Sequence, residues 1–184
     1  MGAGEDGGGV RHLAPIPPNA TRKKQRNTLF IMEQHVKQIP YGVADFAKVI
    51  EQNLYYVDKT MFLPMIEDQP RNLFFIRPRR FGKSIFLSML HSYYDCKQKD
   101  KFQTLFGKLW IGKNPTPNQG RYQVLHFDFS QVGGTIDKLE DKFNEYCCII
   151  LNDFMDIYEE YYPEDTKKAF YASEDAGAKL AIMS

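Results

Sequence analysis

Residues 73–84 constrain the fold of this chain more than any other segment. Four consecutive apolar residues at 73–76 predict a short strand, and a turn rich in arginine follows them. Apolar side chains then recur every three or four residues from Ile85 to Tyr93, which predicts a helix that begins near Gly82, Lys83 and Ser84. A strand, a tight turn and a helix opened by Gly-Lys-Ser is the order that a phosphate-binding loop requires.

The chemistry of such a loop assigns a role to each residue of the tripeptide. Backbone N–H groups at the turn and the positive end of the helix dipole attract a phosphate. We expect Gly82 to allow close approach, Lys83 to contact the β- and γ-phosphates as the catalytic residue, and the Ser84 hydroxyl to ligate Mg²⁺. The expected ligands are therefore ATP and Mg²⁺. The expected nucleotide-binding residues are Arg79, Arg80, Phe81, Gly82, Lys83 and Ser84.

The arginines of the turn leave a second interpretation open. Arg77 stands where the general pattern Gly-x-x-x-x-Gly-Lys-Ser has its first glycine, and Arg79 and Arg80 follow. Guanidinium groups bind phosphate through paired hydrogen bonds, so they would assist the loop amides. They could equally line a nucleic-acid or partner surface or pair with carboxylates. The alternative function is thus a non-enzymatic nucleic-acid or partner-binding module.

Composition narrows the class of protein. A formal net charge of +1 argues against a strongly electrostatic nucleic-acid binder. No apolar run is long enough to span a bilayer, and the first residues lack the apolar centre of a secretion signal. Two of the three cysteines, Cys147 and Cys148, are adjacent, which does not suggest a disulfide framework or a metal site. We therefore expect a cytoplasmic protein with no membrane partner.

The order of predicted elements indicates an α/β fold. Residues 1–30 are rich in Gly and Pro and carry a basic run at 22–26, so we expect a flexible leader before a domain at 31–184. Helical spacing predicts helices over 43–52, 61–66, 85–93, 102–110 and 136–162, and one more between 164 and 184. Besides 73–76, residues 55–57 and 122–129 are strand-forming. This alternation predicts a mainly parallel sheet flanked by helices.

Ligands of open parallel sheets bind beyond the carboxyl ends of the strands. The turn after Ile76 and the carboxylate of Asp128 would both lie at that edge, which makes Asp128 a candidate metal-binding or water-positioning acid. For His126 we favour a satisfied core histidine. For Asp58 and Lys59 we favour a structural ion pair over a place near the nucleotide.

Several segments together resemble the AAA-ATPase-like family of bacterial P-loop proteins. The resemblance rests on residues 39–42, 45–46, 55–60, 77–84 and 125–130, and arginine at the first glycine position belongs to that family's version of the loop. It implies a P-loop fold with Lys83 and Ser84 in the phosphate and Mg²⁺ roles. It also implies that the strand ending at Asp128 follows the loop helix and is not the Walker B strand.

The resemblance further implies parts that we do not find in this sequence. Family members carry a Walker B segment, an apolar run followed by Asp-Glu, and often a nuclease domain resembling restriction endonucleases. We therefore expect the chain to be the N-terminal part of such a protein, truncated before the Walker B strand, with an incomplete sheet. Nucleotide binding would survive and hydrolysis would not be expected. A decayed chain without activity is a further alternative. The expected partner is the nucleotide, and the resemblance also implies nucleic acid as a partner of the nuclease domain absent here.

Overall fold

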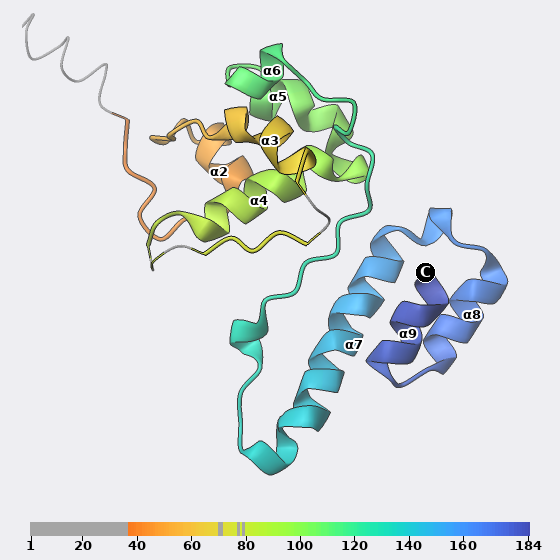
Figure 1. Ribbon diagram of the computed structural model, residues 1–184. Coiled ribbons are helices and arrows are strands. Elements are labelled where there is room, and N and C mark those ends of the chain that lie inside the picture. The colour runs from red at the N-terminus through yellow and green to blue at the C-terminus, as the bar shows by residue number, and fades with distance from the viewer. Residues whose placement is uncertain (1–36, 70–71, 77, 79) are drawn as a thin grey trace, which may run out of the picture.

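The part of the chain that the structure describes is mainly helical, with extended segments between the helices. A computed structural model describes residues 37–69, 72–76, 78 and 80–184 (Figure 1). The expected flexible leader at 1–30, with its basic run, lies outside these residues. The helical elements are α2 (Phe46–Glu51), η1 (Thr60–Phe62), α3 (Leu63–Glu67), α4 (Lys83–Tyr94), η2 (Cys96–Lys101), α5 (Phe102–Phe106), α6 (Trp110–Lys113), η3 (Phe129–Gln131), η4 (Ile136–Lys138), α7 (Leu139–Ile157), η5 (Glu159–Tyr161), α8 (Glu164–Ala172) and α9 (Ala176–Met183).

The prediction of a mainly parallel sheet is wrong. The segments expected as strands are 55–57, 73–76 and 122–129. They lack helical structure except at Phe129, which begins η3, and none of them joins a ladder. The β-pairing found among the described residues is one isolated parallel bridge between Asp95 and Tyr122. The side chains of Phe74 and Ile76 are 88% and 90% exposed, so none of the described elements covers them. An apolar run favours an extended backbone, but a strand also needs a partner whose hydrogen-bonding groups lie alongside it.

Helices α2 to α6 pack around one apolar core, which we call the α2–α6 cluster (Figure 1). Its buried side chains are Phe46, Leu63, Phe86, Met89, Tyr93, Leu105, Phe106 and Ile111. Phe106 lies at the centre of the aromatic contacts, with its ring centroid 5.0 Å from that of Phe46 and 5.4 Å from that of Tyr93. The predicted helix after the Gly-Lys-Ser tripeptide is confirmed as α4, which buries the expected apolar face in this core.

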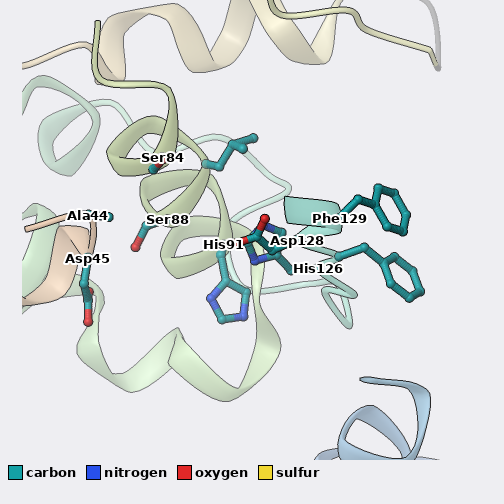
Figure 2. A pocket seen from close by; sticks show the side chains of 10 residues that line it. Ala44, Asp45, Ser84, Ser88, His91, His126, Asp128 and Phe129 are labelled. Carbon is teal, nitrogen blue, oxygen red and sulfur yellow. The ribbon is translucent and has the colours of Figure 1, made fainter. Parts of the chain in front are cut away.

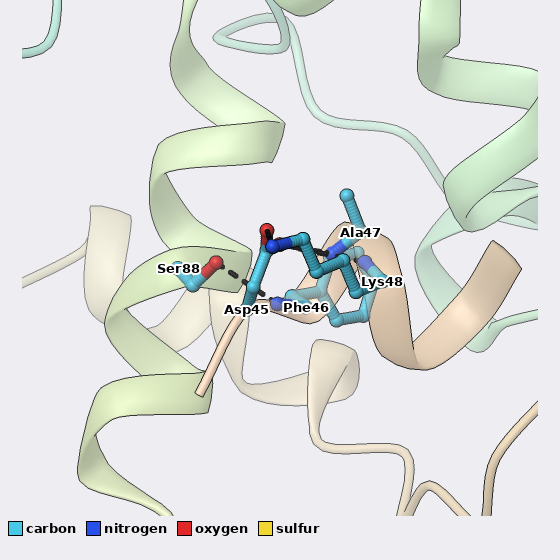
Figure 3. Close-up of polar contacts among 5 residues, drawn as sticks. All are labelled: Asp45, Phe46, Ala47, Lys48 and Ser88. Atoms are coloured by element: carbon cyan, nitrogen blue, oxygen red, sulfur yellow. Dashed lines mark hydrogen bonds and ion pairs between the residues drawn. The ribbon is translucent and has the colours of Figure 1, made fainter. Parts of the chain in front are cut away.

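Hydrogen bonds at the start of α2 join this helix to α4 (Figure 3). Asp45 is the N-cap of α2, and its Oδ1 accepts a hydrogen bond from the Ala47 N–H at 2.9 Å. The next donor, the Phe46 N–H, is satisfied by Ser88 Oγ of α4, also at 2.9 Å. Two N–H groups at the start of α2 that would lack a partner within the helix are therefore hydrogen-bonded. The bond to Ser88 also joins α2 to α4, the helix that carries Lys83.

Helices α7, α8 and α9 form a second core, the α7–α9 cluster, and Figure 1 shows an extended chain leading to it from the α2–α6 cluster. Its buried residues are Cys147, Leu151, Met155, Phe170 and Ala176. The predicted helix at 136–162 is shorter than expected, because α7 ends at Ile157, and two helices follow where one was expected. Thr135 precedes η4 but makes no side-chain capping bond. None of the helices in the described part of the chain has the length and apolarity needed to cross a bilayer.

A buried lysine stabilises the α7–α9 cluster. Lys179 is 3% exposed, and its Nζ donates to Asn152 Oδ1 at 3.0 Å and to the Phe170 carbonyl at 2.9 Å. The ammonium also lies 4.1 Å from the centroid of the Phe170 ring.

We expect Lys179→Ala to lower the free energy of unfolding by about 2–3 kcal/mol, because it leaves a buried carbonyl without its donor. Urea denaturation would measure this loss, and Lys168→Ala, at an exposed lysine of α8, is the matched control, for which we expect almost no change. Equal losses in the two variants would contradict the prediction.

Candidate functional site

The chain makes a left-handed turn where α4 begins. Gly82 is the N-cap of α4, with φ 75° and ψ 25°, and Arg80 has a φ of 67°. A glycine adopts this region without steric cost, whereas an arginine does so at a cost of about 1–2 kcal/mol. The backbone therefore bends sharply just before Lys83. A turn of this kind directs successive peptide N–H groups towards one point, which is how phosphate-binding loops hold anions.

The first turn of α4 carries no negatively charged side chain. Gly82 has no side chain that could cap the helix, and the first turn contains no Asp or Glu. The first N–H groups of a helix lack partners within the helix, and the helix dipole adds a partial positive charge there. This helix start is therefore suited to an anion that comes from outside the chain.

The predicted binding residues gather at this turn, as far as the structure describes them. Lys83 is the first residue of α4 and is half-buried, and Ser84 is exposed beside it. Phe81 is 58% exposed, and Arg80 is also exposed. Arg77 and Arg79 lie outside the described residues. The residues described here thus place the predicted cation and hydroxyl together at the helix start.

One cavity lies on the Ser84 face of α4 (Figure 2). It has a volume of about 460 Å³. Its walls come from one face of α4, from the start of α2 and from the extended segment that contains Asp128. The residues that line it are Ala44, Asp45, Ser84, Leu87, Ser88, His91, His126, Phe127, Asp128 and Phe129. The structure therefore brings Asp128 into the same cavity as Ser84, although the sheet that was expected to do so is not formed. His126 is exposed here, so the expectation of a core histidine is wrong.

Asp128 is held as a carboxylate. The Ser130 side chain and backbone N–H both hydrogen-bond to it and lower its pKa below the usual value, the N–H at 3.1 Å from Oδ1. His91, which also lines the cavity, has its Nε2 3.0 Å from Asp95 Oδ2. Among the described residues no group of three or more His, Cys, Asp or Glu side chains could hold a metal ion. A Mg²⁺ ion here would therefore take most of its ligands from phosphate and water, which suits the usual chemistry of that ion.

A second cavity opens beside Gly82. It has a volume of about 230 Å³, and its lining is mainly apolar and aromatic. The residues that line it are Ile39, Pro40, Tyr55, Tyr56, Val57, Lys59, Gly82, Ile85 and Phe86. The charged group in it belongs to Lys59, whose Nζ lies 3.6 Å from the position that a Cβ on residue 82 would take.

The expected ion pair of Asp58 with Lys59 is not formed. Asp58 Oδ1 accepts hydrogen bonds from the Thr60 N–H at 2.8 Å and the Thr60 hydroxyl at 2.7 Å, and Oδ2 accepts from the Trp110 N–H at 2.8 Å. Thr60 is fully buried, and its Oγ1 accepts from the Ile111 N–H at 3.1 Å. Asp58 and Thr60 therefore cap the start of α6, a role that the sequence interpretation missed. The spacing of an Asp two residues before a Thr suggests a local cap, but nothing in it identifies the distant helix.

A glycine-capped helix start with lysine and serine in its first turn is typical of proteins that bind phosphate-containing ligands. Residues 40–182 match the AAA-ATPase-like family, described as "Predicted AAA-ATPase", and the chain belongs to this family. A curated protein of Azotobacter chroococcum mcd 1, called "Uncharacterized protein in vnfD 5'region", is 49% identical over 55 residues. That alignment covers 29% of this chain and 11% of the relative, so the chain matches a small part of that protein. No solved structure matches the chain.

Proposed function

We propose that this chain binds magnesium-bound ATP through the segment 77–84, of which the structure describes Pro78 and the turn at residues 80–84. The observation that carries the proposal is the start of α4, where a left-handed glycine is followed by Lys83 and Ser84 and no acidic residue stands in the first turn. An electropositive helix start of this kind is complementary to a polyphosphate. Membership of a family described as predicted ATPases supports the same ligand.

Each residue contributes a separate interaction in this proposal. The N–H groups at the turn bind the phosphate chain, and the Lys83 ammonium neutralises the β- and γ-phosphates. The Ser84 hydroxyl supplies one ligand to Mg²⁺, which neutralises phosphate charge when bound. The proposal concerns nucleotide binding.

The metal role of Ser84 gives a direct test by isothermal titration calorimetry. We expect wild-type protein to bind ATP more tightly in Mg²⁺ than in EDTA, and Ser84→Ala to lose most of that difference by removing one metal ligand. A loss of about tenfold in the presence of Mg²⁺ corresponds to one polar interaction with a charged group. Ser184→Ala, at an exposed serine, is the matched control and should behave as wild type. Absence of ATP binding by the wild type would overturn the proposal.

A non-enzymatic nucleic-acid-binding module is the second candidate. The exposed Arg80 and the 58% exposed ring of Phe81 support it, because cationic and aromatic groups side by side suit single-stranded nucleic acid. This function predicts a steep loss of affinity with added salt, since phosphate contacts release counterions. Weak binding of an oligonucleotide that does not change with salt would exclude it.

A further inference from the structure

We infer that Lys59 is a second lysine that contacts the phosphate chain of the bound nucleotide, from the opposite side of the turn to Ser84. The inference rests on the proposed function and extends it to a residue outside the loop segment. Lys59 precedes the Gly-Lys-Ser tripeptide by more than twenty residues. Its spacing therefore carries no signal of a shared site.

The position of the Lys59 ammonium carries the inference. Lys59 Nζ lies 3.6 Å from the position that a Cβ atom on residue 82 would occupy, so the ammonium is adjacent to the turn. Ser84 lines the cavity on one face of α4, whereas Gly82 and Lys59 line the cavity on another face. A phosphate chain on the N–H groups of the turn would therefore have Lys59 on one side and Ser84 on the other.

The backbone on both sides of Lys59 is fixed by hydrogen bonds. Asp58 and Thr60 are bound to each other and to the start of α6, as described above. These contacts hold the Cα of Lys59 in place, so the side chain is oriented towards the turn before any ligand arrives. Such pre-organisation lowers the entropy lost on binding.

Cationic side chains lie close to the positive end of the α4 dipole. Lys59 Nζ stands beside Gly82, and Arg80 belongs to the turn just before it. Within the described residues the Lys59 ammonium has no carboxylate partner, and both oxygens of the adjacent Asp58 accept hydrogen bonds from other groups. Cations near a helix N-terminus repel its dipole. A polyphosphate beside Lys59 would offset the repulsion between its ammonium group and the helix dipole.

The test compares two ligands and three variants by calorimetric titration. We expect Lys59→Gln to lower the affinity for both Mg-ATP and inorganic triphosphate by about tenfold or more, because each complex loses one charge-assisted hydrogen bond. Lys59→Arg keeps the charge and should retain most of the affinity for both. Lys113→Gln changes an exposed lysine at the end of α6 that lines neither cavity, and it should leave both affinities unchanged. Circular dichroism and a thermal melt without ligand show whether each variant is folded.

The outcomes separate this inference from the proposed function. Suppose that the wild type binds Mg-ATP, that Ser84→Ala lowers this affinity, and that Lys59→Gln leaves it unchanged. The role of Lys59 is then refuted and the proposed function stands. If Lys59→Gln lowers the affinity for Mg-ATP but not for triphosphate, Lys59 does not contact the phosphates. It would then act through the apolar cavity, and the inference fails. If wild type binds neither ligand, the proposed function fails and the inference with it.

Discussion

Lys83→Ala is expected to reduce the affinity for Mg-ATP by about 100-fold or more, because a lysine against two phosphates contributes several charge-assisted hydrogen bonds. The residue opens α4 directly after the left-handed Gly82, where the helix dipole and the turn already favour an anion. Removing the ammonium leaves the phosphate charge only partly neutralised. Alanine is the strongest helix former, so α4 should persist and the melting temperature without ligand should change little.

Titration calorimetry with Mg-ATP checks this prediction, together with a thermal melt of each protein. Lys168→Ala, at an exposed lysine of α8 outside the α2–α6 cluster, is the matched control and should bind as wild type does. Equal affinity of wild type and Lys83→Ala would remove Lys83 from the site, whatever the melting temperatures. A large drop in melting temperature would instead assign Lys83 a part in folding.

Phe106→Ala is expected to destabilise the α2–α6 cluster by about 3–5 kcal/mol, the usual cost of truncating a buried phenylalanine. Phe106 is fully buried, and its ring contacts those of Phe46, Tyr93 and Phe102 at centroid distances of 5.0, 5.4 and 5.7 Å. The loss therefore includes apolar burial, a cavity and three aromatic contacts. The core that positions α4 against α2 and α5 should fail first.

Urea denaturation combined with amide hydrogen exchange measures this effect. Exchange should quicken in α2, α4 and α5, while the separate core of the α7–α9 cluster keeps more of its protection. Phe129→Ala is the control, because that ring is 53% exposed and its loss removes far less buried area. Equal destabilisation by Phe106→Ala and Phe129→Ala would show that the core around Phe106 does not hold the cluster together.

The helices of this chain could be predicted because their signals are local. The spacing of apolar residues in 43–52, 85–93 and 136–162 predicted α2, α4 and most of α7, and Asp45 occupies the N-cap of α2. The strands could not be predicted in the same way. The apolar run at 73–76 predicts an extended backbone, but pairing depends on a second segment at the right distance, which no local pattern encodes. That non-local condition is why the predicted parallel sheet is wrong.

The chain's own residue order places Gly82, Lys83 and Ser84 at the start of a helix, because glycine accepts the left-handed turn and the following apolar spacing favours α4. Family membership follows from the same stretch and its neighbours. The folded structure alone brings the Lys59 ammonium against Gly82 and Asp128 into the cavity of Ser84. The capping of α6 by Asp58 fixes the chain beside Lys59, and the N–H of Asp128 donates to the Tyr146 hydroxyl of α7 at 2.8 Å. Contacts between segments far apart in the chain leave no periodic trace in the sequence.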